Sequence, residues 1–139
     1  MFRTVVVGAD ASPTAAKAVD AAIDLVALSG GTLHVVSAYR PVSRSTAGVP
    51  AEFRESIQAD SGVRSVLDEL TARARTRGVA VEPHDQRGDP AQAVLDVAER
   101  VSADLVVAGS QGMQRRVLSS IPNTVAHQAP CAVLIVKTD

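Results

Sequence analysis

A chain of 139 residues is long enough for one domain with a sizeable hydrophobic core. Apolar residues make up 46% of it and aromatic residues only 2%, so the core must consist of Val, Leu, Ile and Ala, as in parallel sheets covered by helices. A net charge of −1 provides no overall attraction to nucleic acid or to an anionic membrane, and the single cysteine, Cys131, excludes an internal disulfide. No apolar run approaches the roughly 20 residues of a membrane span and the N-terminus lacks a signal-peptide pattern, so we expect a soluble cytoplasmic protein.

The first third of the chain has the pattern of a strand, a helix and a second strand. Residues 4–8 (TVVVG) form an apolar, β-branched run typical of a buried strand. Ser12 and Pro13 then predict a helix start, with the hydroxyl as N-cap and proline at the first helical position. Apolar residues recur at helical spacing up to residues 29–31 (SGG), which end the helix, and residues 32–36 (TLHVV) read as the second strand. This spacing is the size of a βαβ unit.

The middle third predicts a loop, a helix, a short strand and another helix. Residues 39–48 are polar and irregular, and the following apolar helical pattern has a weak point at Ser61 and Gly62. Residues 79–82 indicate a third strand, which we expect to stop at Pro83 and to lie near a sheet edge. Asp89 then predicts a helix cap, with Pro90 at the first helical position.

The last third contains the strongest functional signal. Residues 105–108 and Ala132–Val136 read as buried strands, and a short helix is expected over residues 122–128. Directly after the first of these strands comes a Gly-x-x-Gly turn at Gly109 and Gly112. Glycine turns between a strand and a helix start often hold phosphate, because unpaired N–H groups point outward there. Gly109 and Gly112 could equally serve only to turn the chain.

Five segments together resemble the universal stress protein family, in its small single-domain form. They are VVVGADAS, LHVVSAY, GDPAQAVLDVA, ADLVVAGSQG and NTVAHQAPCAVLIV, and they span the chain from end to end. The resemblance implies one domain over residues 1–139 with an α/β fold: a five-stranded parallel sheet of order 3-2-1-4-5 with helices on both faces, a Rossmann-like three-layer sandwich of the adenine nucleotide alpha hydrolase-like type. It also implies a homodimer and, in many members, a site for an adenine nucleotide such as ATP, AMP or cyclic AMP.

The family's nucleotide site can be placed on this sequence residue by residue. The resemblance puts Asp10 beside the ribose and adenine, and Val35 against the base. The resemblance also implies that Ser119 and Ser120, at the place of the family's Gly-Ser or Gly-Thr pair, would hold phosphate oxygens. The complete set that the resemblance implies is Gly8, Ala9, Asp10, Val35, Ala108, Gly109, Gly112, Ser119, Ser120 and Ile121.

The phosphate segment departs from the family pattern. The nucleotide-binding members have nine residues between Gly-x-x-Gly and a Gly-Ser or Gly-Thr pair, whereas only six residues separate Gly112 from Ser119 here. The missing three residues amount to about 10 Å of extended chain. Ser119 also replaces the glycine, which matters if that position needs a positive φ. Arg115 and Arg116 within the segment either add charge for phosphate or are solvated loop residues.

Two function hypotheses follow. The first is an adenine-nucleotide-binding regulatory dimer involved in stress response, and the alternative is a nucleotide-free dimer that acts through protein contacts. Asp10 either meets the nucleotide, or its Mg²⁺, or only orders its own turn. No enzyme motif is found, so we expect no catalytic residue, and His34, His84 and His127 have no second ligand at metal spacing in the sequence. We expect the dimer to form through the last strand, Ala132–Val136, because an apolar edge strand invites pairing.

Overall fold

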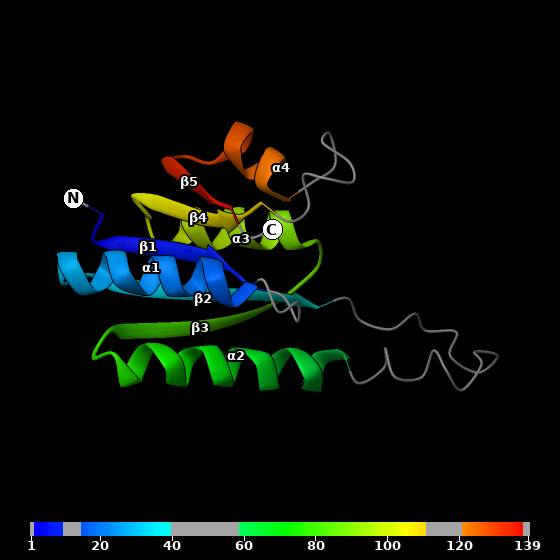
Figure 1. Cartoon of the computed structure of the whole chain (residues 1–139). Helices are drawn as coiled ribbons and strands as arrows, with labels where there is room; N and C mark the ends of the chain where they lie inside the picture. The colour runs from blue at the N-terminus through cyan, green and yellow to red at the C-terminus, as the bar shows by residue number, and fades with distance from the viewer. Residues whose placement is uncertain (1, 10–14, 40–58, 111–120, 138–139) are drawn as a thin grey trace.

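The computed structural model describes residues 2–9, 15–39, 59–110 and 121–137 (Figure 1). Five strands and four helices alternate along these segments. In chain order they are β1 (Thr4–Gly8), α1 (Ala15–Ser29), β2 (Thr32–Tyr39), α2 (Ala59–Thr76), β3 (Ala80–Arg87), α3 (Pro90–Arg100), β4 (Leu105–Gly109), α4 (Ile121–Gln128) and β5 (Ala132–Val136).

The five strands form one parallel sheet in the order β3-β2-β1-β4-β5, which confirms the predicted topology. β1 lies at the centre, because its five residues pair with β2 on one side and three of them, Val5 to Val7, pair with β4 on the other. Helices α1 and α2 pack on one face of the sheet and α3 and α4 on the other, so the molecule has three layers (Figure 1). Since every strand runs in the same direction, all five C-terminal ends meet at one edge of the sheet.

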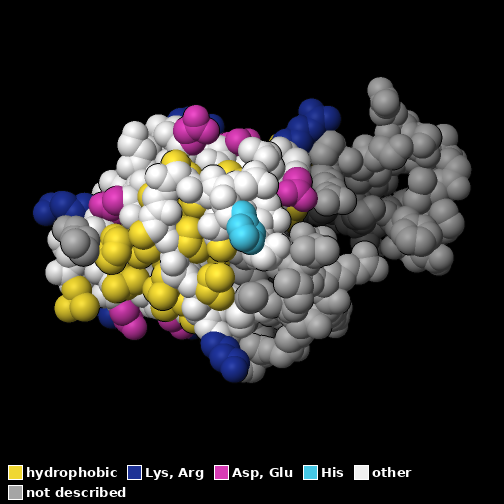
Figure 2. Space-filling view, turned by 90° about the horizontal axis from the view of Figure 1, so that it is seen from above, with side chains coloured by type: hydrophobic (Ala, Val, Ile, Leu, Met, Phe, Trp, Pro, Cys, Tyr) yellow, Lys and Arg dark blue, Asp and Glu magenta, His cyan; other side chains and the backbone are white. Residues whose placement is uncertain are grey.

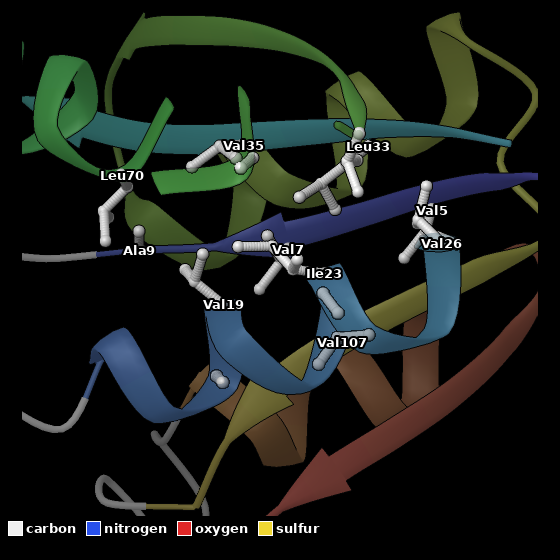
Figure 3. Packing of buried hydrophobic residues seen from close by; sticks show 14 of the residues in the cluster. Val5, Val7, Ala9, Val19, Ile23, Val26, Leu33, Val35, Leu70 and Val107 are labelled. Carbon is white, nitrogen blue, oxygen red and sulfur yellow. The ribbon is translucent and has the colours of Figure 1, made fainter. Parts of the chain in front are cut away.

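Alternation along β1 divides the core into two clusters. Val5 and Val7 face α1 and α2, where they pack with Ile23 of α1 and Leu70 of α2 (Figure 3). Val6 faces the other way and packs with α3 and α4. Each of these three β1 valines is 0% exposed. Burying a side chain of this size contributes about 1.5–3 kcal/mol, so the run TVVVG must occupy a central strand.

The signals that start α3 act as the sequence predicts. Asp89 is the N-cap, and its Oδ2 accepts a hydrogen bond of 3.1 Å from the backbone N–H of Gln92. Pro90 occupies the first turn, where its missing N–H costs nothing. The buried stripe of α3 then covers β1 and β2, and includes Val94 and Val97. The start of α3 therefore lies at the edge of the sheet where the strands end.

Two predicted strand ends were wrong. β2 continues to Tyr39 rather than ending at residue 36, and β3 continues through Pro83 to Arg87 rather than stopping at residue 82. Each of residues 80 to 87 pairs with a β2 residue, so main-chain pairing supports both strands over their full length. The weak point expected at Ser61 and Gly62 does not interrupt the helix, because α2 runs without a break from Ala59 to Thr76.

Pro83 fits inside β3 because of the alternation of the ladder. The Ala9 N–H donates to the Val36 carbonyl, so the main-chain groups of Val36 face β1 and those of Val35 face β3. Pro83 is the register partner of Val35, and its own nitrogen therefore points away from β2 to the open edge. A proline costs no ladder hydrogen bond at that position. The predicted edge location of the third strand is confirmed.

Charged residues near the end of α2 are paired with α1. Arg73 Nε lies 2.8 Å from Asp20 Oδ1, and Arg77 forms a second ion pair of 2.9 Å with Asp24. Exposed pairs of this kind contribute about 0–1 kcal/mol each, so they orient the two helices more than they stabilise them. In the described part of the chain, none of the helices has the length and apolar character required to cross a membrane.

Candidate functional site at the ends of β1 and β4

The two central strands separate where they end. β1 and β4 pair in register from Val5 with Leu105 to Val7 with Val107. Beyond that point the N–H of Ala9 donates to the Val36 carbonyl of β2 over 2.8 Å, whereas the N–H of Ser110 donates to the Val136 carbonyl of β5 over 2.9 Å. The pairing of β1 with β2 and of β4 with β5 thus continues beyond the point where the pairing of β1 with β4 ends. Open α/β sheets bind ligands at such a switch point, where the strand order reverses.

Small residues line the point where β1 and β4 diverge. Gly8 and Ala9 end the β1 side, and Ala108 and Gly109 end the β4 side. Gly8 is also required by packing, because a Cβ at this position would lie 2.9 Å from Cγ2 of Val94 in α3. The N–H groups of Ala9 and Ser110 are both used by the sheet. The described residues therefore form a floor of small side chains, on which polar groups from the adjoining segments could place a ligand.

Ser37 is a site residue that sequence reasoning missed. Its hydroxyl is buried and donates to the main-chain carbonyl of Ala9 over 2.9 Å, so it fixes the chain immediately before Asp10. The two residues are 28 positions apart in the sequence, and the only available signal was a serine among apolar residues in the second strand.

Val35 lies in the core rather than on the surface of the site. It is 0% exposed and pairs in register with Val7, in the cluster between the sheet and helices α1 and α2 (Figure 3). Its proposed contact with a base stays a prediction.

Of the remaining predicted site residues, all except Ile121 lie outside the described part of the chain. Ile121 is described only as the first residue of α4. The structure does not describe Asp10, Gly112, Arg115, Arg116, Ser119 or Ser120. The structure therefore brings together Gly8, Ala9, Ala108 and Gly109 from the predicted set.

Cys131, just before β5, has no feature of a reactive thiol. It is partly buried against the cluster on the α3 side of the sheet. Burial raises the pKa of the Cys131 thiol, and the nearby carboxylate of Asp104 raises it further. Both effects disfavour the thiolate, which is the reactive form. Within the described segments, the His, Cys, Asp and Glu residues also form no group of three or more that could hold a metal ion.

Comparison with known proteins gives the same family over the whole chain. The family model for the universal stress protein family matches residues 1–137. Universal stress protein Rv1636 of Mycobacterium tuberculosis is 32% identical over 99% of this chain and 97% of its own length. Universal stress protein YxiE of Bacillus subtilis is 29% identical over 99% of this chain and 100% of its own.

Solved structures of universal stress proteins have the same fold as this chain. A crystal structure of a universal stress protein in complex with cAMP superposes with a TM-score of 0.81 and 31% identity, covering 99% of this chain and 98% of that one. UspA from Lactobacillus plantarum superposes equally well, at a TM-score of 0.81, although its identity is only 18% and its likeness shows the fold alone. The sheet order, the family match and these relatives together place the chain in the universal stress protein family.

Proposed function

We propose that this protein binds an adenine nucleotide across the C-terminal ends of β1 and β4 and acts as a regulatory dimer in stress response. The observation that supports this most directly is that the pairing of β1 with β4 ends at Val7 and Val107, whereas β1 stays bonded to β2 through Ala9 and β4 to β5 through Ser110. Open α/β sheets bind ligands at such a switch point, and small residues there would let a planar base and a ribose approach the main chain. The site residues are those that the resemblance implies, together with Ser37 as a positioning residue.

The class of ligand is supported by a relative. The structure in complex with cAMP shares 31% identity and the complete fold with this chain. We infer that cyclic AMP, AMP and ATP are the ligands to test, with Asp10 beside the ribose and Gly109 beside the phosphates. A nucleotide with two or more phosphates would be expected to bring Mg²⁺, which favours phosphate and carboxylate oxygens.

The short phosphate segment is the reason to compare these nucleotides directly. The segment between Gly112 and Ser119 has three residues fewer than the pattern of the nucleotide-binding members, which amounts to about 10 Å of extended chain. We therefore propose that a single phosphate, as in cyclic AMP or AMP, is bound more tightly than a triphosphate. The similarity to the cAMP complex favours this over the nucleotide-free alternative.

The dimer is proposed through β5, residues Ala132–Val136. β5 pairs only with β4 in the sheet order, so its other side is an open edge. Leu134 and Ile135, on opposite faces of this strand, are 39% and 37% exposed. Figure 2 shows hydrophobic side chains gathered on the side of the molecule that carries β5 and α4. Pairing of two β5 strands across a two-fold axis would satisfy the open edge and cover these side chains.

The proposal describes a cytoplasmic binding protein rather than an enzyme. Its test is calorimetric titration with cyclic AMP, AMP and ATP, with and without Mg²⁺, after release of any bound nucleotide by heat and chromatography. We expect micromolar binding, weakened at least about tenfold, or 1.4 kcal/mol, by Asp10→Ala and by Gly109→Val. Asp68→Ala, which removes an exposed carboxylate from α2, is the matched control and should bind as the wild type does. Absence of binding up to millimolar nucleotide, with none released on heating, would rule the proposal out.

A further inference from the structure

Two histidines from different strands are in direct contact on the α3 side of the sheet. His34 Nδ1 of β2 lies 2.9 Å from His84 Nε2 of β3, and the ring centroids are 5.1 Å apart. His84 pairs in register with Val36, two residues beyond His34, so the two rings meet diagonally across neighbouring strands. His34 is 6% exposed, whereas His84 is partly exposed.

The contact depends on the number of protons that the pair holds. A neutral imidazole has one N–H donor and one lone pair, so one ring donates to the other across the 2.9 Å contact. A first added proton can bind to an outward-facing nitrogen, which leaves the shared hydrogen bond intact. A second added proton gives both facing nitrogens an N–H. Two donors cannot remain 2.9 Å apart without an acceptor, so the contact must then open.

The surroundings of the pair oppose protonation. Burial lowers the pKa of His34, and the carboxylate of Glu82, its register partner on β3, partly offsets this. Burial also lowers the pKa of His84, with repulsion from His34 and from Arg100 of α3 acting in the same direction and Glu82 acting against them. On β1 the register partner of His34 is the uncharged Val6. The net effect is that both rings stay neutral at neutral pH.

This contact matters because little else attaches β3 on this face. On the opposite face, Val81 packs against the core and Asp85 forms an ion pair of 3.1 Å with Arg64 of α2. On the α3 face, the residues at positions 82, 84 and 86 are Glu, His and Gln, none of which adds to the apolar cluster. β3 is also an edge strand, held by main-chain pairing on one side alone.

We propose that His34 and His84 form an acid-sensitive clamp, which attaches the edge strand β3 to β2 and opens when both facing nitrogens are protonated. The direction of the pH dependence of stability follows from the direction of the two pKa shifts. Because folding lowers both pKa values below the usual value of about 6.5, the unfolded chain takes up protons first as the pH falls. The stability contributed by the pair is therefore complete above about pH 6.5 and is lost as the pH falls through the folded pKa values. This inference needs no bound nucleotide.

The direct test is NMR of the imidazole groups in the wild-type protein between pH 8 and 4, in the presence of EDTA so that no metal bridges the rings. We expect the His34 and His84 signals to titrate together and below about pH 6.5, in two coupled steps. The signal of His127, which is exposed on α4, serves as the internal reference. Independent titration of His34 and His84 at or above about pH 6.5 would overturn the proposal.

The mechanical consequence is tested by hydrogen exchange of the β3 amides, corrected for intrinsic rates. Opening should become more frequent by about tenfold per pH unit for each proton taken up. His84→Gln keeps a hydrogen-bonding group but cannot titrate, so it should flatten this pH dependence, whereas the matched variant His127→Gln should retain the wild-type dependence. If exchange in His84→Gln depends on pH as steeply as in the wild type, the proposal is wrong. If this variant fails to fold, the NMR titration of the wild-type protein still tests the proposal.

Discussion

The hydroxyl of Ser37 donates a hydrogen bond of 2.9 Å to the main-chain carbonyl of Ala9. Ser37 belongs to β2 and Ala9 is the last described residue before Asp10. The N–H of Ala9 is bonded to Val36 of the same strand, so both main-chain groups of Ala9 are attached to β2. The end of β1 is therefore held on β2 beyond the point where its pairing with β4 ends.

Ser37→Ala should weaken both the fold and nucleotide binding. The variant leaves the buried carbonyl of Ala9 without its hydroxyl donor, and a group of this kind costs about 1–3 kcal/mol when unsatisfied. Urea unfolding gives the loss in free energy, and calorimetric titration with cyclic AMP gives the loss in affinity. Ser37→Thr keeps the hydroxyl and should restore most of both. Ser65→Ala on the exposed side of α2 is the control, and an equal effect there would show that the Ser37 hydroxyl has no special role.

Gly31 and Gly30 are adjacent but should differ in how well they tolerate alanine. A Cβ at Gly31 would overlap the main chain of Arg3, whose carbonyl accepts the N–H of Thr32 over 2.7 Å. At Gly30 no atom lies within 4 Å of the added Cβ, and only the φ of +73° is unfavourable. Gly31→Ala should cost about 3 kcal/mol or more, and Gly30→Ala about 1–2 kcal/mol. Thermal unfolding of the two variants compares these costs, and a reversed order would contradict the geometry.

Gly8 and Val94 should show coupled effects on stability. The added Cβ of Gly8→Ala would lie 2.9 Å from Cγ2 of Val94, and the β-branched valine of a helix has little freedom to rotate away. Gly8→Ala should therefore cost about 1–3 kcal/mol. Val94→Ala removes the clashing methyl groups, so the double variant should be more stable than the sum of the single effects by about 1 kcal/mol. Strict additivity in urea unfolding would mean that Val94 does not limit the space at Gly8.

Charges on β5 should dissociate the proposed dimer. Leu134→Glu combined with Ile135→Glu would place two carboxylates at the open sheet edge, where close approach of a second copy would bury them. Sedimentation velocity at micromolar concentration should show a dimer for the wild type and a monomer for this variant. Leu28→Glu is the matched control, because Leu28 is 87% exposed on α1 and is not at the β5 edge. A monomeric wild-type protein would contradict the dimer.

Local sequence signals account for most of the architecture. Four of the five strand centres coincide with short apolar runs, and Asp89 with Pro90 starts α3 as predicted. These signals are readable because buried strands, caps and glycine turns act within a few residues of chain. The ends of β2 and β3 could not be predicted from local signals. β3 continues through Pro83 because the proline nitrogen faces an open edge, and only the strand register decides that.

The candidate site also contains both residues that the sequence could locate and a residue that only tertiary contacts reveal. Motif resemblance placed Gly8, Ala9, Ala108 and Gly109 at the C-terminal ends of β1 and β4, because these residues end or directly follow short apolar runs. Their role in binding stays a prediction. Ser37 could not be located in this way, because its partner Ala9 is 28 residues away and only strand pairing brings them together. For the same reason the contact between His34 and His84, 50 residues apart, had no sequence signal.

The sequence by itself therefore determined the class of fold, and its resemblance to the family implied the strand order and the edge of the sheet at which a ligand is expected. The class of fold depends on hydrophobic periodicity and on residues next to one another in the chain. The tertiary structure alone decided how far the paired strands extend, which carbonyl Ser37 holds and that two imidazoles share a hydrogen bond. Those relationships depend on strand register, and register arises only when distant segments pack together.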